Sequence, residues 1–230
     1  MDYELEMGMW LGGVGNRLSE PIRIADAFDH VFGFCLLNDW SARGIQMFES
    51  MLGPFLGKSF ATTVSPWIVT AEALEPFRTT SFPRPSNEFD TAPYLLDERD
   101  RLAGGYNVEL EAFVRSTAMR MRGDAFLRIC QTNFRHMYWT WAQMLAHHAS
   151  NGCNLGAGDL IGSGTCSGPA ISSAGCLLEL TVRSVQHWHL PNGEQRLYLQ
   201  DGDEISLRAK ATLPGRVTIG FGDCVGMIVA

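Results

Sequence analysis

The sequence predicts a mainly β protein of the α+β class, and three observations lead to this. Its 24 glycines and 10 prolines indicate many turns and therefore many short strands. Short apolar or alternating runs recur along the chain, whereas one stretch alone has the 3,4 spacing of a strong amphipathic helix. A chain of 230 residues with 46% hydrophobic residues fits one globular domain, so we expect residues 1–230 to form a single domain.

The first half of the chain contains apolar runs of strand length separated by turn residues. In order, we expect a strand over residues 4–11 interrupted by Gly8, a strand over 31–37, a short helix to about Gln46 capped by Asn38 or Asp39, two extended pieces within 58–69 broken by Pro66, a long surface loop over 77–105, and a half-buried strand over 107–114.

The second half opens with the strong helical pattern. Its apolar stripe consists of Phe134, Met137, Tyr138, Trp141, Met144, Leu145 and His148. Asn151-Gly152 is a typical helix stop. Further strands are expected over residues 160–161, 177–185, 196–199, 204–208 and 216–220.

Composition argues against several classes of protein. A net charge of −7 without a Lys/Arg run disfavours a nucleic-acid surface. The apolar runs are far shorter than the roughly 18 residues of a membrane span, and no export signal opens the chain, so we expect a cytoplasmic protein. Six scattered cysteines without a Cys-x-x-Cys pair predict reduced thiols rather than disulfides or zinc.

Two carboxylates lie at strand spacing near the start of the chain. On a strand, Glu4 and Glu6 share a face with their Cα atoms about 6.5 Å apart, so one cation can take an oxygen from each. The alternative, a solvated polar face on an edge strand, is the commoner reading of such a pair taken alone.

A second group of charges follows the apolar run over 31–37. Asp39 emerges where that run meets a loop, which suits either a ligand role or a helix cap. Arg43 either joins the site or pairs with Asp39 along the helix. Lys58 stands isolated among Gly, Pro, Phe and Ser, which indicates either a bound anion or carbonyl nearby or a contribution to solubility. Thr62 follows as a possible oxygen donor.

Three further features are ambiguous. The glycine-dense stretch over 162–169 lets backbone N–H groups approach a ligand, or forms a tight structural turn. Glu179 interrupts an apolar run and is either outward-facing or paired inside. His148 lies on the apolar helical face and is expected to be a core histidine.

Together these segments closely resemble the C-terminal catalytic domain of fumarylacetoacetases, in the fumarylacetoacetate hydrolase family. The resemblance runs from end to end, and residues 52–60 and 147–155 look specific to fumarylacetoacetases within the wider superfamily. It rests on Glu4-Leu5-Glu6-Met7, Gly15-Asn16-Arg17-Leu18, Asn38-Asp39-Trp40-Ser41-Ala42-Arg43, Leu52-Gly53-Pro54-Phe55-Leu56-Gly57-Lys58-Ser59-Phe60, Thr63-Val64-Ser65-Pro66-Trp67, Tyr138-Trp139-Thr140, His147-His148, Asn151-Gly152-Cys153-Asn154-Leu155, Ser163-Gly164-Thr165, Leu178-Glu179-Leu180, Asp201-Gly202-Asp203-Glu204 and Ile219-Gly220-Phe221-Gly222.

The resemblance implies a mixed β-sandwich roll with few helices and a homodimer. It also implies hydrolysis of a carbon–carbon bond in a small diketo acid, 4-fumarylacetoacetate, to fumarate and acetoacetate, the last step of tyrosine and phenylalanine breakdown. The resemblance implies that Glu4, Glu6 and Asp39 ligate Mg²⁺ or Ca²⁺, and that Lys58 and Thr62 lie near a second Mg²⁺-type site and the substrate. It implies that Arg43, Gln46 and Thr165 contact the substrate. It also implies that Glu179 orients a water-activating His and that Lys58 and the metal stabilise the leaving group.

The chain also departs from the family pattern. The family's catalytic His, one further carboxylate ligand and a small β domain lie upstream of the Glu-x-Glu strand, so we expect weakened cation binding and little hydrolysis by this polypeptide alone. Gly44 stands where an Asp is usual, and Glu49-Ser50-Met51-Leu52 is one residue short where the family usually has a substrate-contacting Tyr. The alternatives are another superfamily chemistry, such as acylpyruvate hydrolysis or oxaloacetate decarboxylation, and a catalytically silent structural or ligand-binding subunit.

Overall fold

The structure is a computed structural model that describes residues 1–53, 55–85 and 91–229. Its strands are β1 (Leu5–Leu11), β2 (Val31–Asp39), β3 (Thr62–Val64), β4 (Val69–Thr70), β5 (Arg78–Thr79), β6 (Gly105–Tyr106), β7 (Glu109–Arg115), β8 (Leu127–Asn133), β9 (Leu160–Gly162), β10 (Trp188–His189), β11 (Gln195–Arg196), β12 (Glu204–Ala211) and β13 (Ile219–Met227). The α-helices are α1 (Arg43–Glu49), α2 (Ala71–Leu74), α3 (Glu98–Ala103), α4 (Thr117–Arg122), α5 (Trp141–His148) and α6 (Leu177–Leu180).

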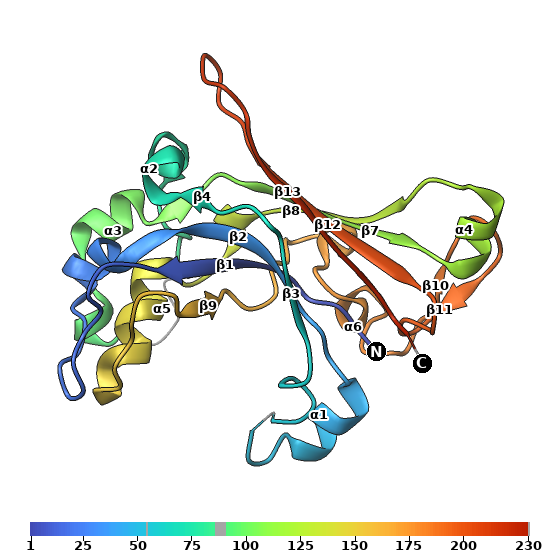
Figure 1. Ribbon diagram of the computed structural model, residues 1–230, viewed down its shortest axis with the longest axis horizontal. Helices are drawn as coiled ribbons and strands as arrows, with labels where there is room; N and C mark the ends of the chain where they lie inside the picture. The colour runs from blue at the N-terminus through green and yellow to red at the C-terminus, as the bar shows by residue number, and fades with distance from the viewer. Residues whose placement is uncertain (54, 86–90, 230) are drawn as a thin grey trace.

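Two larger sheets form the body of the molecule (Figure 1). The first has the order β3-β2-β1-β9, with β4 also paired to β2, and the second has the order β13-β12-β7-β8. Strands β12 and β13 pack against β2, so the two sheets share one core. The ladders that the described residues form are antiparallel. The α+β class with few and short helices is confirmed.

Strand β1 lies between β2 and β9 and is buried along most of its length. Because strand side chains alternate, Tyr3, Leu5 and Met7 enter the core while Glu4 and Glu6 face the other side. Gly8 does not interrupt the strand. A Cβ there would lie 2.8 Å from a Leu160 side-chain carbon, so glycine lets β9 approach closely.

The core extends beyond β1 and β2 to α5. The Phe34 ring on β2 lies 5.4 Å from Tyr106 and 5.6 Å from Trp141, measured between ring centroids. Trp141 in turn stacks on Phe134 at 5.4 Å. These rings attach the helical end of the molecule to the first sheet, where aromatic pairs add to the free energy of area burial.

Several predicted elements are confirmed. The strands over residues 4–11, 31–37, 107–114, 160–161 and 204–208 correspond to β1, β2, β7, β9 and β12, and β3 and β4 are the two pieces broken by Pro66. The turn at Asn151-Gly152 ends the helical region, with Gly152 at φ 82°. The six cysteines are free.

The predicted long helix is wrong in part. A 3₁₀ turn over Phe134–His136 precedes a break, and α5 begins only at Trp141. Thr140 and Gln143 form a capping box, in which each side chain accepts a hydrogen bond from the other residue's backbone N–H. The apolar 3,4 spacing runs across this break because both parts cover the same core. His148 is exposed and is not a core histidine.

The strand predicted over residues 177–185 is also wrong. Residues Leu177–Leu180 form α6, since the backbone N–H groups of Leu177 and Leu178 donate to the Asp2 carboxylate instead of joining a ladder. Val182 then adopts φ 50°, which is unusual for a β-branched residue.

Three other boundaries differ from prediction. The expected surface loop over 77–105 contains β5 and α3, although residues 86–90 lie outside the described part. The strand predicted over 196–199 shortens to β11, and the one predicted over 216–220 begins only at Ile219.

Among the described residues, no helix has the length and apolarity required to cross a bilayer.

Candidate cation and substrate site

Three carboxylates converge where β1 begins and β2 ends. Glu4, Glu6 and Asp39 each offer an oxygen, and these oxygens lie within 4.8 Å of one another. The backbone places them: Asp39 N–H donates to the Glu4 carbonyl across the β1–β2 ladder, and Glu6 follows on the same face. Glu4 is 8% exposed and Glu6 is 3% exposed. The alternative of a solvated edge face is therefore wrong.

Lys58 neutralises part of this cluster. Its Nζ lies 2.7 Å from Glu4 Oε2 and 3.0 Å from Asp39 Oδ2. The loop after α1 reaches the site because Gly57 packs against Gln46, where a Cβ would lie 2.6 Å from a backbone nitrogen. The Lys58 side chain is 17% exposed, so it serves the site rather than solubility.

Arg43 binds two acids, but Asp39 is not one of them. Its Nη1 donates to Glu4 Oε1 at 2.6 Å and to Gln46 Oε1 at 3.0 Å, while its Nε donates to Asp2 at 2.8 Å. The predicted capping of α1 by Asn38 or Asp39 is likewise wrong. The N-cap is Ala42, because β2 continues through Asp39 and that side chain turns to Lys58.

The glycine-dense stretch contributes a backbone donor. Gly164 N–H donates to Glu6 Oε2 at 3.0 Å, and a Cβ on Gly162 would lie 2.8 Å from that same oxygen. The ligand-approach interpretation of this stretch is thus favoured over a plain turn. Thr165 follows Gly164 and lies close to Gly175.

The charges set unequal proton affinities. Burial raises the pKa of Glu4, but hydrogen bonds and charge from Lys58 and Arg43 outweigh it and leave that pKa lowered. Burial, followed by the Glu4 carboxylate, raises the pKa of Glu6 to about 9. In the absence of a cation, one carboxyl of the cluster therefore retains a proton near neutral pH.

The donor set fits a hard divalent cation. Two oxygens bound to one Ca²⁺ at about 2.3–2.6 Å lie no more than about 5 Å apart, and the three carboxylates meet this limit. When all four acids, Asp2, Glu4, Glu6 and Asp39, are ionised, they face two cationic side chains, Arg43 and Lys58. Two negative charges then remain, which is the charge of one Mg²⁺ or Ca²⁺.

Two predicted site residues, Thr62 and Glu179, are exposed and lie outside the carboxylate cluster. Thr62 pairs with Asp39 in the β2–β3 ladder and is exposed. Glu179 is on α6, is exposed, and accepts a hydrogen bond from Ser167 Oγ, so the outward-facing interpretation holds. Among the hydrogen bonds and ion pairs of the described residues, none joins a histidine to Glu4, Glu6 or Asp39.

Asp2 is the site residue that sequence reasoning missed. It is fully buried and accepts hydrogen bonds from Arg43, from its neighbour Tyr3, and from Leu177 and Leu178. A signal was present, since Asp2 continues the period-2 alternation of Glu4 and Glu6.

Known proteins resemble the chain over its whole length. The family profile described as "Fumarylacetoacetate (FAA) hydrolase C-terminal" matches residues 1–229. Fumarylacetoacetase of Bos taurus is 44% identical over 230 residues, and that of Arabidopsis thaliana is 46% identical over 230 residues. Each match covers 100% of this chain and 52% of the relative, so the chain spans about half the length of the curated relatives it matches.

Solved structures share the fold at lower identity. A fumarylacetoacetate hydrolase from psychrophilic Exiguobacterium antarcticum superposes with a TM-score of 0.53 at 22% identity, covering 100% of this chain and 56% of the other. A maleylpyruvate hydrolase from Sphingobium gives a TM-score of 0.52 at 19% identity, covering 99% of this chain and 54% of the other.

The buried Asp2–Arg43 pair makes a testable prediction. Asp2→Ala is expected to lower the free energy of unfolding by about 3–5 kcal/mol, because it leaves a buried guanidinium short of a partner. It should also speed amide exchange at Leu177 and Leu178, which lose their acceptor. Asp26→Ala, which breaks an exposed pair with Arg23, should lower the free energy of unfolding far less. Urea denaturation and hydrogen exchange measure both effects, and equal losses in the two variants would contradict this role for Asp2.

Proposed function

Because the chain belongs to the fumarylacetoacetate hydrolase family, we propose that it holds the cation and substrate for hydrolysis of 4-fumarylacetoacetate to fumarate and acetoacetate. The observation that supports this most is the convergence of Glu4, Glu6 and Asp39 with Lys58 and Arg43. Relatives of 42–46% identity bear the name fumarylacetoacetase. We also propose tyrosine and phenylalanine breakdown as the pathway.

In the proposed site, Glu4, Glu6 and Asp39 hold Mg²⁺ or Ca²⁺, which when bound supplies Lewis-acid polarisation of the diketone oxygens. Hydrolysis adds a water-derived hydroxyl to one carbonyl carbon and breaks the adjacent carbon–carbon bond. The bonding electrons pass to the leaving carbon as an enolate, which then takes up a proton. The Lys58 ammonium lies beside the cluster and stabilises the negative charge of this enolate oxygen.

We propose that Arg43, Gln46 and Thr165 bind the substrate's polar groups. Arg43 Nη1 donates to Gln46 Oε1, so the two side chains are held together at the edge of the cluster. Asp2 acts through Arg43 as a positioning residue, since its carboxylate holds the guanidinium from behind. We also propose that Thr62 lies near a second Mg²⁺-type site and that Glu179 orients a water-activating histidine.

Cation binding is the first test. Glu6→Gln is expected to weaken Mg²⁺ and Ca²⁺ binding at least about tenfold, because losing a direct ligand costs no less than losing an outer-shell partner. Glu179→Gln removes an equal charge at an exposed position and should leave affinity unchanged. Isothermal titration of the metal-free protein measures both, and equal affinities in the two variants would count against this ligand set.

Turnover is the second test, followed as loss of diketo-acid absorbance with identification of fumarate. We expect slow hydrolysis that depends on added cation, and we expect Lys58→Met to reduce it by about 10²–10³-fold. Lys210 is the chain's other lysine and pairs with Glu109 on the second sheet, so Lys210→Met is a matched control with unchanged rate. If the cation-loaded protein shows no turnover, the hydrolase proposal fails and a catalytically silent subunit takes its place.

We also propose a homodimer, supported by an exposed apolar arm formed by α1 and the loop after it. The arm projects from the body of the molecule (Figure 1). Its most exposed side chains are Met47, Phe48, Met51 and Leu52, of which Phe48 is 90% and Met51 94% exposed. Contiguous apolar surface of this kind is typical of an interface.

The six free cysteines support the cytoplasm as the proposed compartment.

The double variant Phe48→Ser, Met51→Ser is expected to shift a dimer to monomer in analytical ultracentrifugation, because it removes apolar area from the arm. Met121→Ser changes a side chain that is 84% exposed on α4, and should leave the dimer intact. A wild-type protein that sediments as a monomer at all concentrations would contradict the proposal.

A further inference from the structure

A cavity of about 630 Å³ lies at the helical end of the molecule, away from the carboxylate cluster. Its walls come from the chain after β5, from the segment leading into α3, and from α3 and α5. In Figure 1, α3 and α5 lie at one end of the first sheet, whereas α1 projects elsewhere. The volume is typical of small-molecule sites, which run to about 300–1,000 Å³.

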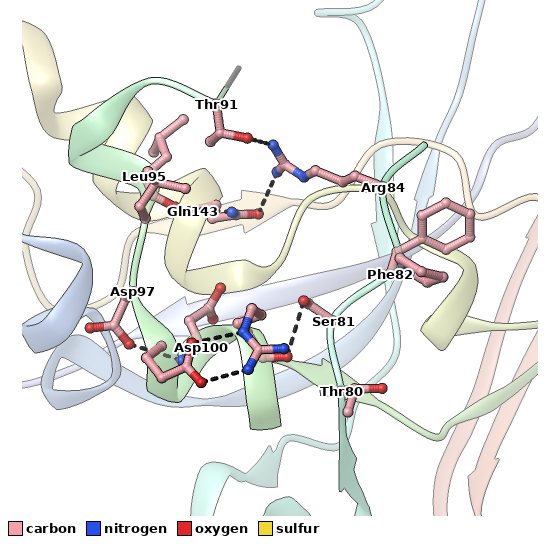
Figure 2. Close-up of a pocket in the computed structure, with 13 residues that line it drawn as sticks. Thr80, Ser81, Phe82, Arg84, Thr91, Leu95, Asp97, Asp100 and Gln143 are labelled. Atoms are coloured by element: carbon pink, nitrogen blue, oxygen red, sulfur yellow. Dashed lines mark hydrogen bonds and ion pairs between the residues drawn. The ribbon is translucent and has the colours of Figure 1, made fainter. Parts of the chain in front are cut away.

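Arg84 is the distinctive group of this cavity. Its guanidinium carbon lies 4.8 Å from the Tyr138 ring centroid and 4.4 Å from that of Trp139. Its Nη atoms donate to Thr91 Oγ1 and, at 3.3 Å, to Gln143 Oε1 (Figure 2). These neutral partners orient the guanidinium without forming an ion pair with it.

Neighbouring arginines differ in this respect. Arg101, on the rim of the same cavity, pairs with Glu98 at 2.5 Å, and Arg78 pairs with Glu75 at 3.2 Å. Among the described residues, no carboxylate forms an ion pair with Arg84. A guanidinium has five N–H donors, so Arg84 keeps unused donors for a planar anionic group.

The rest of the cavity narrows the choice of anion. Phe82 adds apolar surface beside Arg84, and Leu95 adds apolar surface across the cavity, next to Gln143 (Figure 2). Asp97 and Asp100 lie on the other side of the cavity, as Figure 2 shows, and Asp100 is 5% exposed. These acids repel a multiply charged anion more strongly than a single carboxylate, so the cavity favours one carboxylate on an apolar body.

We propose that this cavity binds a small organic monocarboxylate, with the carboxylate on Arg84 and the apolar body against Phe82 and Leu95. The site is distinct from the carboxylate cluster and does not require a divalent cation. Its identification is therefore independent of the hydrolase proposal, and either can fail without the other.

The test uses benzoate as the probe and the full chain in chelator, so that the cation site contributes nothing. Fluorescence of Trp139, which lies beside Arg84, and isothermal titration report binding. We expect saturable binding that weakens about tenfold or more in Arg84→Gln, since a hydrogen bond to a charged group is lost. Arg101→Gln is the matched control, because it removes an equal charge from the same cavity, and should change affinity less than about twofold.

Arg84→Lys covers the case in which Arg84→Gln does not fold. It keeps the charge but loses the planar fork, so benzoate should bind more weakly than to wild type. Circular dichroism and thermal melting establish folding of each variant. Absence of saturable benzoate binding to wild type, equal affinity in the Arg84 variants and wild type, or tighter binding of inorganic phosphate than of benzoate would each overturn the proposal.

Discussion

The site depends on compensation of buried charge around the first strand. Glu4 and Glu6 occupy the interior of a sheet, where an isolated carboxylate is costly. Arg43 and Lys58 make Glu4 tolerable as an anion, and Asp2 in turn balances Arg43. Glu6 lies on β1, Asp2 and Glu4 lie just before it, and Arg43 and Lys58 come from α1 and the loop that follows, so the position of that loop is linked electrostatically to the first sheet. Glu6 is left with a backbone donor as its favourable partner, and its raised pKa reflects that shortage.

Much of the fold follows from local pattern. The alternation over β7 predicts a strand because that strand is buried on one face. The apolar runs of β1 and β2 predict strands because these strands are buried on both faces. Local pattern predicts the wrong secondary structure where a single long-range contact determines the backbone conformation. The apolar run after Cys176 has strand composition, yet the Asp2 carboxylate takes its first two N–H groups and α6 results. A prediction from local sequence cannot include a hydrogen-bond acceptor, here Asp2, that lies at the far end of the chain.

The same distinction holds for the site. The carboxylates, Lys58 and Arg43 could be named from residue type and from the family resemblance, and the structure brings them together. The partners of Arg43 could not be named, since Asp39 is nearer in sequence but Asp2 and Glu4 are nearer in space. The cavity around Arg84 was likewise hidden, because it joins the chain after β5 to α3 and α5 within a region whose composition indicates only a surface loop.

The close approach of β9 to the cluster restricts which residue can stand at position 162. At Gly162 even a methyl group would collide with the Glu6 carboxylate, although this glycine has ordinary negative backbone torsion and sits in a strand where larger residues are favoured. The stability of the strand and the integrity of the acidic cluster therefore place opposite demands on this residue. A larger residue here would force the Glu6 carboxylate to move from its place beside the Gly164 N–H, so residue 162 couples the packing of β9 to the geometry of the acidic cluster.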